Sequence, residues 1–97
     1  MRVFSLSTLR KFWEKHADAE QSLRAWFAEA ERADWTGPQD IKNRCRSADF
    51  LPGDRVVFNI KGNKSRLIVA LKYEFKAVYV RFVGTHAEYD AIDAEQV

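Results

Sequence analysis

The architecture of this chain follows mainly from residues 55–72, which read RVVFNIKGNKSRLIVALK. Two runs rich in β-branched and other apolar residues, 55–60 and 65–72, flank a short turn, and this pattern predicts a β-hairpin. The dipeptide Gly62-Asn63 suits a two-residue hairpin loop. A third β-rich run, residues 77–83, follows another short turn and extends the hairpin to a three-strand antiparallel meander.

The two turns predict the register of the meander. The first loop pairs Lys61 with Lys64, and the turn at 73–76 pairs Lys72 with Ala77. One face of the sheet is then apolar across all three strands, as expected for a face that packs against a core. The predicted rows on this face are Val56/Val69/Val80 and Phe58/Leu67/Phe82.

The opposite face of the meander carries charge. There Asn59 faces Arg66 and Ile68 faces Arg81, which makes the two arginines diagonal neighbours across a strand pair. Diagonal positions lie roughly 7–8 Å apart at the backbone, close enough for both side chains to contact one phosphate. The alternative is that these arginines are ordinary exposed charges, with or without acidic partners from a helix.

The residues before the hairpin predict a short strand and two helices. Residues 1–5 are partly alternating, and Ser5 or Ser7 can cap the helix that follows. Asp18 and Gln21 have the spacing of a capping box for the second helix. A short helical turn is expected at 38–46. The two helices carry the apolar stripes Leu6/Leu9/Phe12/Trp13 and Leu23/Trp26/Phe27/Ala30.

The amino-acid composition limits the classes of protein to which the chain can belong. The chain has 97 residues, 46% of them apolar and 13% aromatic, which suits one domain spanning residues 1–97 and argues against disorder. No apolar run is long enough to span a membrane, and residues 1–11 lack the layout of a secretion signal. A single cysteine, Cys45, cannot form an internal disulfide, so a cytoplasmic location is expected.

Charge is unevenly distributed along the chain. From Asp18 to Asp40 there are six acidic and two basic residues, whereas from Ile41 to Arg81 there are ten basic and three acidic ones. A basic half of this kind favours an anionic partner, most often nucleic acid. Ordinary solvated lysines and arginines on strand faces would give the same count.

The segment after the last strand contains the residues best suited to chemistry. Thr85 and Glu88 have capping-box spacing, so a short helix is expected to begin with His86 at its first position and Tyr89 one turn later. A histidine at a helix N-terminus tends to stay neutral and can act as a general base. Together with Arg66 and Arg81, this is the composition of a metal-free ribonuclease site. A purely structural capping role is the alternative.

Other chemistries have little support. The sequence contains no P-loop, dinucleotide-binding or nucleophile-elbow motif, and no group of residues has metal-ligand spacing. His16 is expected at the end of the first helix, where it suits the helix dipole. Cys45 lies between Arg44 and Arg46, which could lower the pKa of its thiol. No base accompanies Cys45, so we expect no chemical role for it. The sequence as a whole gives no reason to expect a cofactor.

Two segments resemble the HigB family of toxin–antitoxin systems. They are VFNIKGNKSRLIV, residues 57–69, and YVRFVGTHAEYD, residues 79–90. The resemblance implies an α+β, RelE-like fold: a short N-terminal strand, two helices, a three-strand antiparallel meander and a short C-terminal helix. It also implies a ribosome-dependent messenger-RNA endonuclease that inhibits translation and is neutralised by a HigA-type helix-turn-helix antitoxin. Direct DNA binding would then belong to the antitoxin complex.

By match to these motifs, His86, Tyr89, Arg66 and Arg81 are the active-site candidates. His86 is expected to be general base or acid, Tyr89 its partner or a stacking surface, and the arginines stabilisers of transition-state charge. The residues expected to bind messenger or ribosomal RNA are Asn59, Lys61, Lys64 and Lys72. A non-catalytic RNA- or protein-binding module with the same basic sheet is the alternative function, and a purely structural subunit is a third.

Overall fold

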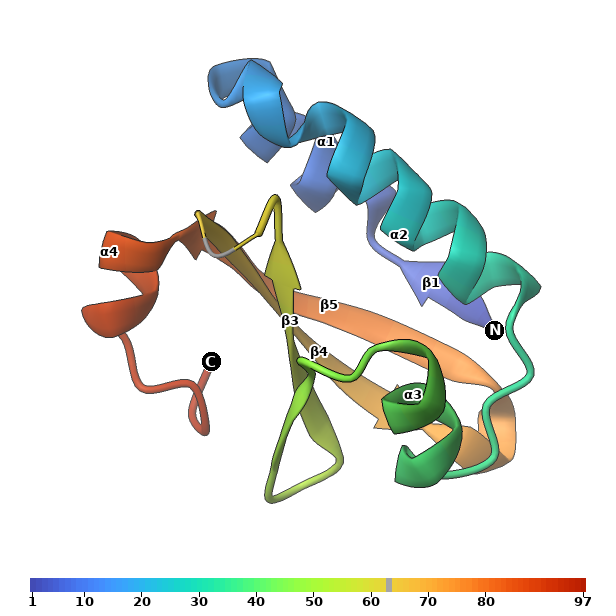
Figure 1. Cartoon of the computed structure of the whole chain (residues 1–97). Helices are drawn as coiled ribbons and strands as arrows, with labels where there is room; N and C mark the ends of the chain where they lie inside the picture. The colour runs from blue at the N-terminus through green and yellow to red at the C-terminus, as the bar shows by residue number, and fades with distance from the viewer. Residues whose placement is uncertain (63) are drawn as a thin grey trace.

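The computed structural model describes residues 1–62 and 64–97 and has helices packed on a five-stranded sheet (Figure 1). The first half contains β1 (Arg2–Phe4), α1 (Leu6–Lys15), the 3-10 turn η1 (Ala17–Ala19), α2 (Glu20–Arg32) and α3 (Pro38–Arg44). The second half contains β2 (Asp49–Leu51), β3 (Arg55–Ile60), β4 (Ser65–Lys72), η2 (Tyr73–Phe75), β5 (Ala77–Thr85) and α4 (His86–Asp90). No helix of the described residues is long and apolar enough to cross a membrane.

The sheet confirms the predicted α+β class and adds one strand to it. The strand order is β1-β5-β4-β3-β2, with β1 parallel to β5 and the other neighbours antiparallel. The predicted meander is therefore the centre of the sheet. The additional strand, β2, is only three residues long and joins β3 through a turn in which Gly53 and Asp54 both have positive φ.

The register between β3 and β4 is as predicted. Phe58 pairs with Leu67, Val56 with Val69, and Asn59 with Arg66. The hairpin turn was predicted at Gly62-Asn63, of which Asn63 lies outside the described residues.

The register between β4 and β5 is as predicted only near the η2 turn. Lys72 pairs with Ala77 and Val69 with Val80, but an irregularity between Ile68 and Val69 adds one residue to β5. Beyond it Ile68 faces Phe82 and Leu67 faces Val83, so the predicted pairs Leu67–Phe82 and Ile68–Arg81 are wrong. An extra residue on one strand of this kind is a β-bulge, and it shifts every later residue of that strand by one position.

Helices α1 and α2 cover one face of the sheet, as their apolar stripes predict. Leu9 and Leu23 are fully buried, and the edge of the Trp26 ring meets Phe58 of β3 at a centroid distance of 5.5 Å. The start of α2 differs from the prediction. Residues 17–19 form η1 and Ala19 takes the N-cap position without a side-chain hydrogen bond, so Asp18 and Gln21 form no capping box.

The other face of the sheet is covered near its β3 side by the chain that follows α4. Figure 1 shows this segment, in red, returning beside β3 on the side of the sheet opposite α1 and α2. Arg55 donates a hydrogen bond to the carbonyl of Val97, and Val57 and Ile68 on this face are fully buried. This face also carries Arg66, whose neighbours form the candidate site.

Candidate active site

The first turn of α4 is fixed by a reciprocal cap. Thr85 Oγ1 accepts a hydrogen bond from the Glu88 backbone N–H at 3.2 Å, and Glu88 Oε1 accepts one from the Thr85 N–H at 2.8 Å. This is the capping box that the sequence predicts. It holds His86 at the first helical position and Tyr89 one turn later, both at the end of the sheet where β5 passes into α4.

Arg66, on β4, lies at the same end of the sheet as His86 and Tyr89. Its Nη2 lies 3.4 Å from Nε2 of His86, and its Cζ lies 4.7 Å from the centre of the Tyr89 ring. The backbone N–H of His86 also donates to the Lys64 carbonyl at 3.0 Å, which ties α4 to the start of β4. The structure therefore brings together three of the four predicted active-site residues: Arg66, His86 and Tyr89.

The ring of His86 has a second partner, which sequence reasoning missed. Its Nδ1 lies 3.1 Å from Oδ2 of Asp90, one helical turn further along α4. Arginine is only a donor, so the contact with Arg66 makes Nε2 an acceptor and places the ring proton of a neutral His86 on Nδ1, facing Asp90. A carboxylate that holds the tautomer in this way leaves Nε2 as the basic atom. The i, i+4 spacing was the signal available in the sequence.

Arg81, the fourth candidate, does not lie where it was predicted. Arg66 pairs with Gly84 of β5, while Arg81 stands exposed at the bulge, three residues earlier in the strand. The predicted diagonal pairing of Arg66 with Arg81 is therefore wrong. The cause is the extra residue in β5, which displaces Arg81 from the position opposite Ile68.

Gly84 pairs with Arg66 at a point where there is no room for a larger residue. A Cβ at this position would lie 2.5 Å from Cζ of Phe82 and 3.1 Å from Oε1 of Glu88. Phe82 faces this side of the sheet only because of the bulge. A glycine within a strand often marks such a close approach, which is how the sequence could have indicated it.

The four predicted RNA-binding residues are divided by the fold. Asn59 is paired with Arg66 across β3 and β4, and Lys64 accepts the bond from His86, so both adjoin the cluster. Lys72 lies at the opposite end of β4, where it pairs with Ala77. Lys61 lines a cleft beside the N-terminal end of α2.

His16 and Cys45 lie outside this cluster. His16 ends α1, as predicted, and stacks on Phe12 with the ring centroids 4.4 Å apart. Burial and the nearby carboxylate of Glu29 raise the pKa of the Cys45 thiol, and Arg44 only partly opposes them. Arg44 acts in the expected direction, but the pKa of the thiol is raised overall, so the expected lowered pKa is wrong.

Comparison with known families identifies the chain. The profile of the HigB toxin family, described as the RelE-like toxic component of a toxin–antitoxin system, matches residues 19–92. No curated protein gave a significant match. The matched region includes α2, the whole meander and α4, and therefore every residue of the Arg66–His86–Tyr89 cluster. The chain belongs to the HigB toxin family, the RelE-like toxic components of toxin–antitoxin systems.

Proposed function

We propose that this toxin is an endoribonuclease that cuts messenger RNA on the ribosome and so inhibits translation in the cytoplasm. The observation that carries the proposal is the contact of Arg66 with both His86 and Tyr89, which brings a base, a tyrosine and a permanent cation together, half-buried, at one end of the sheet. Family membership implies an antitoxin partner, for which we propose a HigA-type helix-turn-helix protein.

In the proposed reaction, Nε2 of His86 removes the proton from a ribose 2′-OH, and the 2′-oxygen attacks the adjacent phosphorus. The bond from phosphorus to the 5′-oxygen breaks, leaving a 2′,3′-cyclic phosphate and a 5′-hydroxyl. Arg66 stabilises the charge on the pentavalent phosphorane. The Tyr89 hydroxyl protonates the leaving oxygen, and Asp90 holds the His86 ring.

The side chain of His86 is accessible enough for this role. It is 41% exposed, so a ribose can reach Nε2 by displacing the long 3.4 Å contact with Arg66. That displacement opens Nη2 of Arg66 to the phosphate, while the contact of the guanidinium with the Tyr89 ring remains. Contacts in a free enzyme are often longer than those made with substrate.

The test is induced expression of the wild type and His86→Ala, with the 5′ ends of cellular messenger RNA mapped in both. Growth arrest and new cuts positioned on ribosomes are expected in the wild type. Because a general base contributes roughly 10²–10⁴-fold, His86→Ala is expected to lose cleavage at least about 100-fold. His16→Ala is the matched control, since His16 caps the C-terminal end of α1, outside the cluster. Normal cutting by His86→Ala would refute the assignment.

A second function is favoured by a different feature of the same face. Phe4 and Tyr79 are exposed and stacked with ring centroids 5.2 Å apart, and Arg2 lies 5.3 Å from the Phe4 ring centre. Exposed rings beside a cation suit stacking of unpaired bases, which would serve an RNA-binding module without catalysis. Such a module would bind RNA with salt-sensitive affinity and leave it intact, whereas the nuclease would leave a cyclic phosphate.

A further inference from the structure

The face of the sheet that carries Arg66 remains exposed on its β1 side. The segment after α4 lies beside β3, at the other side of this face (Figure 1). Phe4 of β1 and Tyr79 of β5 are paired neighbours, 38% and 37% exposed, and their rings stack with the centroids 5.2 Å apart. Val3 and Val78, which alternate with them, pack into the core. Two stacked rings are therefore presented to solvent on the face opposite α1 and α2.

Basic residues lie on both sides of these rings. Arg2 and Lys72 both pair with Ala77, one row of the sheet before the rings. Arg81 stands at the bulge, two residues after Tyr79. All three cations are exposed, and none of them belongs to an ion pair found among the described residues. Strands β1, β4 and β5 together contain four basic residues and no acidic one. A surface with this charge favours an anionic ligand.

The same strand that holds one of the rings leads to the candidate active site. Gly84, five residues after Tyr79 on β5, pairs with Arg66, and α4 begins with His86 two residues later. At roughly 3.3 Å per strand residue, the rings lie about 15 Å from the position opposite Arg66. Phe82 is between them, with its ring over the place that a side chain at Gly84 would occupy. The rings and the cluster therefore belong to one continuous surface.

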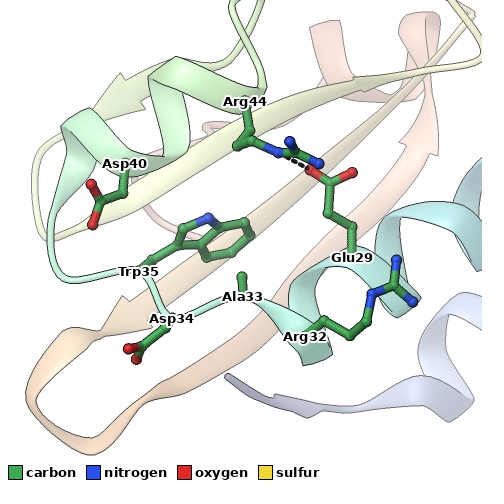
Figure 2. Close-up of a pocket in the computed structure, with 7 residues that line it drawn as sticks. All are labelled: Glu29, Arg32, Ala33, Asp34, Trp35, Asp40 and Arg44. Atoms are coloured by element: carbon green, nitrogen blue, oxygen red, sulfur yellow. Dashed lines mark hydrogen bonds and ion pairs between the residues drawn. The ribbon is translucent and has the colours of Figure 1, made fainter.

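A cleft between α2 and α3 has the opposite character. It measures about 340 Å³ and is lined by three acids, Glu29, Asp34 and Asp40 (Figure 2). Glu29 pairs with Arg44 at 3.4 Å, and Asp34 pairs with Lys76 at 2.7 Å. The cations near this cleft are therefore already engaged, and its carboxylates would repel a phosphate backbone. An anionic ligand is expected on the exposed sheet surface and not in this cleft.

We propose that this stacking surface, formed by Arg2, Phe4, Lys72, Tyr79 and Arg81, binds unpaired nucleotides of single-stranded RNA on one side of the cleavage site. The inference rests on the proposed nuclease, whose substrate it takes as the ligand. Unpaired bases stack on the exposed rings, and the cations contact the phosphates that join them. RNA is favoured over an acidic peptide because the surface leads into a site proposed to act on a ribose and a phosphate.

The first test measures binding without cleavage. The probe is a 2′-O-methyl oligouridylate of eight nucleotides, which lacks the 2′-hydroxyl that the proposed reaction needs, and fluorescence anisotropy reports its affinity for the full chain. Tyr79→Ala and Phe4→Ala should each weaken binding at least about fivefold, because each removes a ring on which a base stacks. Tyr79→Phe keeps the ring and should bind as the wild type does.

Two matched controls connect the binding to this surface. Phe50 is also 38% exposed but lies on β2, at the opposite edge of the sheet, so Phe50→Ala should leave affinity unchanged. Lys72→Ala should lower the salt dependence of binding by about one phosphate contact, whereas Lys11→Ala, on exposed α1, should not. Unchanged affinity in Tyr79→Ala, or equally tight binding of an oligoglutamate peptide of matched charge, would overturn the proposal.

The second test locates the bound nucleotides relative to the cut. Messenger RNAs that lack a single base, at each position in turn around one cut, are cleaved on purified ribosomes by the wild type and by Tyr79→Ala. Some missing bases should slow the wild type at least about fivefold and leave Tyr79→Ala unaffected, and these positions should all lie on one side of the cut. Finding no such position, or finding them on both sides, would overturn the placement.

The two tests distinguish failure of this inference from failure of the nuclease assignment. If the wild type leaves messenger RNA uncut while Tyr79→Ala weakens oligouridylate binding, the RNA contact stands and the nuclease assignment fails. If the wild type cuts messenger RNA while Tyr79→Ala changes neither binding nor the effect of missing bases, the stacking surface fails and the nuclease assignment stands.

Discussion

The guanidinium of Arg66 lies over the ring of Tyr89, with Cζ 4.7 Å from the ring centre, although the two residues come from β4 and α4. A cation held over an aromatic face is stabilised by about 0.5–1 kcal/mol at an exposed site. Tyr89 therefore has two separable roles in the proposed reaction: its ring contacts Arg66, and its hydroxyl is proposed to protonate the leaving oxygen.

Two substitutions of Tyr89 separate these contributions. Tyr89→Phe keeps the ring under Arg66 and removes the hydroxyl, so we expect a fall in cleavage of roughly 10²-fold if the hydroxyl is the general acid. Tyr89→Ala removes both and should be slower still. Single-turnover cleavage of messenger RNA on purified ribosomes measures the difference. Unchanged cleavage in Tyr89→Phe would leave Tyr89 with only the positioning role.

The two arginines are expected to differ in their effect on cleavage. Arg66→Ala removes the cation that contacts His86 and should raise the barrier by about 3 kcal/mol, or roughly 10²-fold in rate. Arg81→Ala should change the rate less than about tenfold, because the bulge places Arg81 away from the position opposite Ile68. The same ribosome assay compares the two variants. Equal losses of cleavage rate would mean that Arg81 also belongs to the active site.

Gly84 is expected to be intolerant of even one added carbon. Gly84→Ala would bring its Cβ against Phe82 and the Glu88 carboxylate, and overpacking of this kind costs about 1–3 kcal/mol. Urea unfolding measures the loss. Gly37→Ala is the control, since a Cβ there meets nothing within 4 Å. Adding Phe82→Leu to Gly84→Ala should recover part of the stability, and failure to do so would point to the Glu88 contact instead.

Low pH should lower the stability contributed by Asp40 in the first turn of α3. Two hydrogen bonds from Thr36, the backbone N–H and the hydroxyl, hold the pKa of Asp40 below its ordinary 3.8. The carboxylate therefore contributes stability that is present above its unfolded pKa and lost as pH falls through the lower folded value. Asp40→Asn removes the charge that these bonds stabilise.

Urea unfolding of the wild type and Asp40→Asn at about pH 6 and about pH 3 measures this contribution. At about pH 6 the wild type should be more stable than Asp40→Asn, and this difference in stability should shrink at about pH 3. A difference that is constant across this range would mean that Thr36 does not favour the charged form.

The meander was predictable because its turns have clear chemical signals and its strands alternate. The bulge in β5 was not predictable, because Phe82 and Val83 are both apolar. With or without the extra residue, one of the two faces the helices, so the apolar pattern does not distinguish the two registers. β2 was missed because three residues are too short for a periodic pattern, although Pro52-Gly53 indicated a turn before β3.

The candidate site was predictable to the extent that it depends on local sequence. Thr85 and Glu88 placed His86 and Tyr89 correctly, since a capping box fixes the first turn by itself. The placement of Arg81 depended on the register between strands, and one extra residue was enough to make it wrong. Asp90 had the spacing to contact His86, but only the structure orients the two side chains toward each other.

The parallel pairing of β1 with β5 has a consequence for how the protein is made. Arg2 pairs with Ala77 and Phe4 with Tyr79, so β1 leaves the ribosome well before β5 and has no partner strand until β5 has been made. Contacts so distant in sequence form slowly. The same late segment leads into α4, which carries His86 and Tyr89. A growing chain can therefore assemble α1 and α2 before β5 exists, yet it completes both the sheet and the candidate site only after β5 and α4 have been made.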